Sequence, residues 1–265
     1  MSNPHRPYLP PEILDLIIGL LCDQPKTLER CCLVSRSWVP RTRRHLFSSI
    51  EFGYSGDLGL WKGAFPDPEN SPAYHTRTLR MFCPDLVTGV DTEEGGWIRA
   101  FSRIVRLEVW SHPGNSPQSD VSLTPFHTFS PTLKSLRIVS TNSSCSQIFT
   151  LVRSLPLLED LCVIDEGMDK SDDETTNLQP STSPALTGSL ELDLPYGMEG
   201  TARRLFDLPN GLHFRRFVCI RCVEEDLRWI MGLVKRCSDT LEYIDIRCYL
   251  SGTFLRLLQW DQCLS

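Results

Sequence analysis

The amino-acid sequence predicts an α/β protein in which a short helical region precedes a stack of strand-and-helix units with parallel strands. An apolar-x-x-apolar-x-apolar pattern recurs through residues 46–246, and segments with a helical spacing of apolar residues separate several of its copies. A unit of this size cannot bury its own apolar face, so each one must pack against its neighbours. The middle positions fall at residues 50, 79, 107, 136, 161, 192, 217 and 244, at intervals of 25 to 31 residues, with the loosest copy around 192.

The composition is that of a globular protein with one or two domains. The chain has 265 residues, of which 41% are hydrophobic and 23% charged, and its formal net charge is -6. That charge argues against a protein that wraps nucleic acid by neutralising phosphates. The longest apolar run near the N-terminus, residues 16–22, is far shorter than the ~20 residues of a membrane-spanning helix. We therefore expect no membrane span and a cytoplasmic or nuclear location.

The 11 cysteines are expected to be reduced, because their number is odd and their spacing irregular. Cys219 and Cys222 have the spacing of half a zinc site, but Cys237 and Cys248 do not form a second such pair. On a regular strand, positions 219 and 222 would also face opposite sides. No phosphate-binding loop, dinucleotide fingerprint or nucleophile motif is present in the sequence. The sequence predicts no catalytic, metal-binding or cofactor-binding residue, and a protein that is not an enzyme.

The first fifty residues differ in charge from the rest. They hold seven Lys and Arg against four acidic residues, a surplus of +3 that leaves -9 for the remainder. This asymmetry predicts two modules, residues 1–50 and 51–265. The arginines at positions 36, 41, 43 and 44 favour a solvated face, with an acidic partner or nucleic acid as the alternative.

Three short helices are expected in the first module. The first begins at Pro10 and Pro11, because the first helical turn needs no N–H partner. The second spans residues 25–34 with Asp23 as its N-cap, and the third begins near Ser35, although Pro40 predicts a late start or a kink. The first helix carries two apolar stripes, which are Ile13, Ile17, Leu20 and Leu21, and Leu14, Ile18 and Cys22. Three such helices cannot bury both stripes, so the rest of the chain or another protein must cover one.

The spacing of these residues resembles the F-box motif over residues 8–48. The match consists of Leu9-Pro10-Pro11-Glu12-Ile13 followed by Leu28-x-x-Cys31-x-x-Val34-Ser35-Arg36-x-Trp38. The resemblance implies a three-helix F-box that docks on the Skp-family adaptor of an SCF-type cullin-RING ubiquitin ligase. The alternative is an N-terminal helical cap on the following array. By resemblance, the adaptor would be met by Leu9, Pro10, Ile13, Leu14, Ile17, Leu28, Cys31, Val34 and Trp38.

Residues 51–265 resemble the divergent leucine-rich-repeat arrays that follow many F-boxes, which implies an irregular solenoid. Helices are expected at residues 145–155, 201–208 and 224–237, whereas 53–75 and 111–128 give no clear helix. A helix that closes the array is expected near the end of the sequence, from the apolar residues Phe254, Leu255, Leu257, Leu258 and Trp260. The alternative is an irregular α/β domain with coincidental leucine spacing.

Residues 165–188 are acidic at first and then rich in Ser, Thr and Pro. Such a segment buries too little apolar surface to offset the conformational entropy that it would lose on folding. We therefore expect a disordered loop that is either a surface insertion or a regulatory site. The whole chain is then a substrate-recognition adaptor of the ligase, in which the array holds an unknown protein substrate. The alternatives are a scaffold that recruits no ligase and an enzyme with an unrecognised site.

Overall fold

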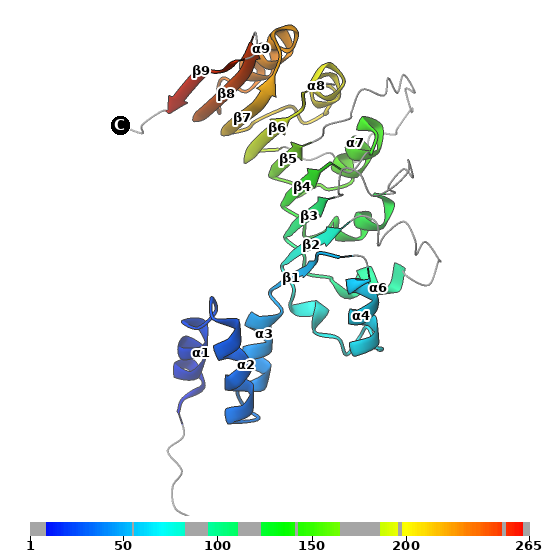
Figure 1. Ribbon diagram of the computed structural model, residues 1–265, viewed down its shortest axis with the longest axis vertical. Coiled ribbons are helices and arrows are strands. Elements are labelled where there is room, and N and C mark those ends of the chain that lie inside the picture. Colours follow the sequence, from blue (N-terminus) through cyan, green and yellow to red (C-terminus); the bar gives the residue numbers. More distant parts are fainter. Residues whose placement is uncertain are drawn as a thin grey trace, which may run out of the picture.

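Three N-terminal helices lead into a nine-stranded sheet that carries helices along one side and leaves its other face open (Figure 1). These counts refer to the described part of the chain. The structure is a computed structural model. It describes residues 9–54, 56–82, 95–110, 123–140, 143–164, 186–195, 198–250 and 253–261, without the side chains of 95, 96 and 249–261.

The N-terminal helices each hold a proline in their first turn, as expected. The third helix begins only at Val39, which confirms the late start predicted from Pro40 and corrects the start near Ser35. The N-cap of the second helix is Gln24 rather than Asp23, and no side chain caps this end. The helices are α1 (Pro11–Gly19), α2 (Pro25–Val34) and α3 (Val39–Leu46).

The strands follow one another across the sheet in chain order. All neighbours from β1 to β8 are parallel, and only β9 is antiparallel to its neighbour. The middle apolar positions pair in register, except that Leu190 takes the place expected for Leu192. The strands are β1 (Ser49–Phe52), β2 (Thr78–Phe82), β3 (Arg106–Trp110), β4 (Ser135–Val139), β5 (Asp160–Ile164), β6 (Ser189–Asp193), β7 (Arg216–Cys222), β8 (Tyr243–Leu250) and β9 (Thr253–Asp261).

Three of the helices between the strands were expected from the spacing of apolar residues, and helix α4 was not. Helices occur at the three expected segments, although α8 begins at Met198, before the expected start at residue 201. The first of them starts with a capping box formed by Ser144 and Gln147. Helix α4 lies in residues 53–75, where none was expected. The elements are α4 (Asp57–Ala64), η1 (Pro72–His75), α6 (Gly95–Ala100), η2 (Thr124–Phe129), α7 (Cys145–Arg153), α8 (Met198–Phe206), η3 (Glu224–Asp226) and α9 (Leu227–Arg236).

One apolar core runs between the sheet and the helices along the whole array. Leu186 belongs to this core, and Gly188 donates its backbone N–H to the carbonyl oxygen of Glu159 at 3.0 Å. These two positions correct the end of the loop expected at 165–188, because they pack against the sheet. The rest of that loop, 165–185, lies outside the described residues. The largest fully buried side chains include Phe101, Phe126, Phe129, Phe149 and Phe214.

The last described segment is a strand and not the helix expected around residues 254–260. Strand β9 pairs with β8 along its length, with Thr253 opposite Leu250 and Asp261 opposite Tyr243. An apolar run without clear periodicity fits either element, and pairing with the edge of the sheet decides for the strand. No helix in the described ranges is long and apolar enough to cross a membrane.

The end of strand β7 contains a β-bulge that the sequence does not reveal. The register with β8 shifts between Cys219 and Cys222, and Arg221 adopts a left-handed φ of 57°. The extra residue turns both cysteines to the buried side, which corrects the expectation that they face opposite sides. Cys222 forms a disulfide with Cys248 on β8, which corrects the expectation that all cysteines are reduced.

We predict opposite effects of alanine at two glycines. A Cβ atom on Gly188 would collide with the Asp160 carboxylate and lie 3.0 Å from the carbonyl oxygen of Glu159, so Gly188→Ala should destabilise the fold by about 1–3 kcal/mol. Gly200 lies exposed in α8 with nothing within 4 Å of an added Cβ, so Gly200→Ala should stabilise by about 0.5–1 kcal/mol. Urea unfolding measures both, and a neutral Gly188→Ala would contradict the packing at β6.

Candidate partner-binding surfaces

The N-terminal module has a small core of its own, separate from the core of the array. Leu14 and Ile18 from α1 pack there with Leu28 from α2. Leu14 and Ile18 belong to the second stripe of α1, so the module buries two of the three residues of that stripe by itself, whereas Cys22 is exposed. Partly buried side chains from all three helices complete this core, namely Leu21, Trp38 and Leu46.

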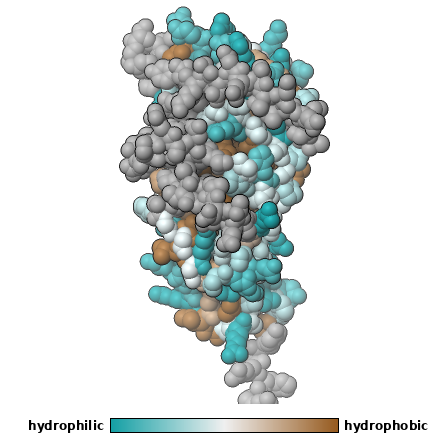
Figure 2. All heavy atoms as spheres, turned by 90° about the vertical axis from the view of Figure 1, so that its right-hand side faces the viewer, coloured by the Kyte–Doolittle hydropathy of each residue, from teal (hydrophilic) through white to brown (hydrophobic). Residues whose placement is uncertain are grey.

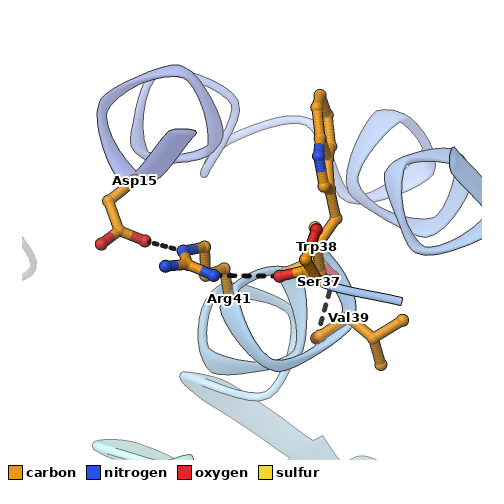
Figure 3. Close-up of polar contacts among 6 residues, drawn as sticks. Asp15, Ser37, Trp38, Val39 and Arg41 are labelled. Atoms are coloured by element: carbon orange, nitrogen blue, oxygen red, sulfur yellow. Dashed lines mark hydrogen bonds and ion pairs between the residues drawn. The ribbon is translucent and has the colours of Figure 1, made fainter. Parts of the chain in front are cut away.

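Polar contacts hold α1 and α3 together around this core (Figure 3). The guanidinium of Arg41 donates from Nε to Asp15 Oδ1 at 2.5 Å and from Nη1 to the carbonyl oxygen of Ser37 at 3.0 Å. The fully buried Thr42 donates its hydroxyl to the carbonyl oxygens of Trp38 and Val39, at 2.9 and 3.1 Å. Of these contacts, the Arg41–Asp15 pair joins α3 to α1, and the others lie within residues 37–42.

Two residues of the first stripe, Ile13 and Leu20, are exposed, and so is the end of α2. Leu20 is 75% exposed and Leu33 is 87% exposed, values far above those of the module's core. Figure 2 shows hydrophobic side chains in brown at the lower end of the molecule. Burying one such leucine is worth about 2 kcal/mol, so the surface favours a partner. We call this set the apolar docking surface, and it consists of Leu9, Ile13, Leu16, Leu20, Leu33 and Val34.

The nine residues expected to meet an adaptor divide into three groups. Leu14, Leu28 and Cys31 are buried in the interior of the module, and their contact with an adaptor stays a prediction. Ile17 and Trp38 are half-buried between core and solvent. The four that remain exposed are Leu9, Pro10, Ile13 and Val34.

Motif spacing missed three members of the docking surface, which are Leu16, Leu20 and Leu33. Ile13, Leu16 and Leu20 follow one another at intervals of three and four residues along α1 and its C-cap, which is one helical face, and Leu9 precedes the helix. A search for a further apolar stripe would have found Leu16. On α2, no periodic signal marks Leu33, since its exposure depends on how α2 packs against α3.

The open face of the sheet carries a row of alternating charge on its first four strands. Arg80 lies 3.3 Å from Glu51 on one side and 3.2 Å from Glu108 on the other, and Arg137 follows Glu108 at 3.7 Å. Arg137 also reaches across β5 to Glu191, at 3.9 Å. These pairs are largely exposed, so each adds only about 0–1 kcal/mol to stability. Together these pairs form a row on the open face in which positive and negative side chains alternate and balance one another.

Cys162 occupies this row on β5, between Arg137 and Glu191. Burial and the nearby Glu191 carboxylate raise the pKa of its thiol to about 12, so the thiol stays protonated at neutral pH. Burial likewise raises the pKa of Cys219 to about 12. Neither thiol is poised as a nucleophile. Among the described residues, no three His, Cys, Asp or Glu side chains are grouped to hold a metal ion.

A second row on the open face is apolar and lies at the carboxyl ends of the strands. Phe82, Trp110, Val139 and Ile164 are in register on consecutive strands, and Phe82 and Trp110 have their ring centroids 6.4 Å apart. All but Phe82 are half-buried, so they offer apolar surface without a fully exposed side chain. An apolar row beside a charged row has the composition of a protein-binding face.

The apolar row is interrupted by an ion pair that depends on the bulge in β7. Asp193 is only 9% exposed and accepts a hydrogen bond from Arg221 Nε at 2.6 Å. Arg221 reaches this carboxylate from the left-handed bulge position. A carboxylate buried to this extent requires such a partner, because desolvation of an unpaired charge is costly.

We predict that this pair contributes more than the exposed ones. Arg221→Ala leaves a buried carboxylate without its cation and should cost about 2–3 kcal/mol, less than for a fully buried pair because Arg221 is partly exposed. The control Arg80→Ala removes an exposed arginine with two carboxylate partners and should cost less than about 1 kcal/mol. Urea unfolding of both variants measures the difference, and equal losses would show that the Asp193 pair has no special role.

Comparison with known proteins does not assign this chain to a family. No family model matches the sequence, and neither a curated protein nor a solved structure matches it. A functional assignment therefore depends on the residues of the motif and on the two surfaces described above.

Proposed function

We propose that this chain is a substrate-recognition adaptor of an SCF-type cullin-RING ubiquitin ligase, with its N-terminal helices docking on a Skp-family adaptor. The observation that carries the proposal is the apolar docking surface on a module whose residues have the spacing of an F-box. The array does not cover Leu16, Leu20 or Leu33, so their burial requires another protein. Docking through several leucines of one face is a common way in which a helix is recognised.

The scaffold alternative has less support. A helical cap would bury its apolar face on the first unit of the array. The module does contact the array, through α3 and the short helix η1. Leu20, however, lies at the end of α1 with three quarters of its surface exposed, so the array does not cover the stripe.

The array supplies the substrate-binding part of the proposal, as a divergent leucine-rich-repeat solenoid. Its open face offers the charged row and the apolar row, and it is not covered by the helices (Figure 1). In this role the protein does no bond-making itself. It raises the effective concentration of a substrate lysine near the charged conjugating enzyme.

We predict that Leu20→Asp abolishes binding to a purified Skp-family adaptor. A carboxylate placed in an apolar contact should weaken the complex at least about tenfold. Leu60 on α4 provides a matched control, because it is also a leucine that is 75% exposed. Biolayer interferometry with the immobilised full chain measures both variants, and circular dichroism checks that each is folded.

Two outcomes would refute the adaptor assignment. One is unchanged adaptor binding by Leu20→Asp, and the other is an equal loss of binding in Leu60→Asp. Failure of the parent chain to bind any Skp-family adaptor at micromolar concentration would leave the scaffold reading as the better one.

A further inference from the structure

Five exposed arginines lie where α3 meets the amino ends of the first strands. Arg43 and Arg44 are in the last turn of α3. Arg77 immediately precedes β2, Arg103 lies in the turn before β3, and Arg106 is the first residue of β3. We call these residues the basic cluster.

Backbone hydrogen bonds bring the members of this cluster close together. Arg77 donates its N–H to the carbonyl oxygen of Ser48 at 2.8 Å, and Ser48 lies two residues after the end of α3. Arg106 in turn donates its N–H to the carbonyl oxygen of Arg77 at 3.0 Å. Positions far apart in the sequence are thus neighbours at one edge of the molecule.

None of the five arginines has a carboxylate partner among the described residues, in contrast to the cations around them. Arg80, three residues after Arg77, contacts two glutamates, and Lys134, directly before β4, contacts Glu159 at 2.6 Å. The excess positive charge has a visible effect on His75, which lies beside the cluster. Burial and the charges of Arg44, Arg103 and Arg43 lower the pKa of this histidine.

We propose that the basic cluster binds an acidic segment of a protein partner, with several carboxylates spaced along an extended peptide. Guanidinium groups form paired hydrogen bonds with carboxylates, and five of them on neighbouring elements fit a run of acidic residues better than a single anion. An acidic protein segment is favoured over nucleic acid because the net charge of -6 repels any polyanion, and this repulsion grows with the charge of the ligand, which is much larger for a nucleic acid than for a segment with several carboxylates. This site lies apart from the apolar docking surface and does not depend on recruitment of a ligase.

The test uses the full chain and a fluorescein-labelled decaglutamate peptide, followed by fluorescence anisotropy. The variant Arg43→Gln/Arg44→Gln should bind decaglutamate about tenfold more weakly than the parent. The matched control is Arg203→Gln/Arg204→Gln, because this pair also occupies the last turn of a helix, α8. Its affinity should stay within about twofold of the parent, and added salt should weaken the binding of all variants that bind.

Three outcomes would overturn the proposal. These are equal losses in the two variants, equal binding of a decaglutamine peptide by the parent, or tighter binding of an oligodeoxythymidine than of decaglutamate. The second variant Arg77→Gln/Arg103→Gln changes the same cluster from the array side. This second variant tests the proposal if the first variant is poorly folded. It should also bind decaglutamate about tenfold more weakly than the parent.

Discussion

At six of the seven junctions between parallel strands, one backbone carbonyl oxygen accepts two consecutive N–H groups of the next unit. The carbonyl oxygen of Ser48 accepts those of Arg77 and Thr78, at 2.8 and 3.0 Å. This arrangement sets the register of each strand against the next one, so that equivalent positions of all units form rows. The charged row and the apolar row of the open face are consequences of that register. Five other carbonyl oxygens accept two consecutive N–H groups in the same way, namely those of Arg77, Val105, Lys134, Gly188 and Arg215. At the junction of β5 and β6, the Glu159 carbonyl oxygen accepts the N–H of Gly188, and the N–H of Ser189 is donated to Asp160 Oδ1 instead.

Much of the array could be predicted because its strands depend on a local pattern. Three apolar positions in six residues mark a strand that is buried on one face, and the structure has strands at all eight copies. The exceptions are instructive. Helix α4 contains Gly59 and Gly63, which lower helix propensity, and it forms because Leu58 and Trp61 pack against the core. The bulge at Arg221 left no sign in the sequence, because Arg221 pairs with Asp193 on the neighbouring strand β6, 28 residues earlier in the chain.

The candidate surfaces were predictable in kind but not in detail. The excess of apolar residues on α1 correctly indicated that the module could not bury both stripes. Which stripe stays outside depends on the packing of three helices and on contacts such as Asp15 with Arg41, which join distant positions. The alternation of Glu51, Arg80 and Glu108 could have been read from the repeat, since each follows the middle apolar residue. The sequence alone does not show that these side chains form ion pairs with one another.

The chain-order topology has a consequence for how the array assembles. Paired strands are separated by 25 to 29 residues throughout the parallel part of the sheet, so each new strand closes a loop of nearly the same length. Loop-closure entropy depends only weakly on length, so no step of assembly is much more costly than another. Folding can therefore start at any unit and spread in both directions, and a defect in one unit weakens mainly the units beside it.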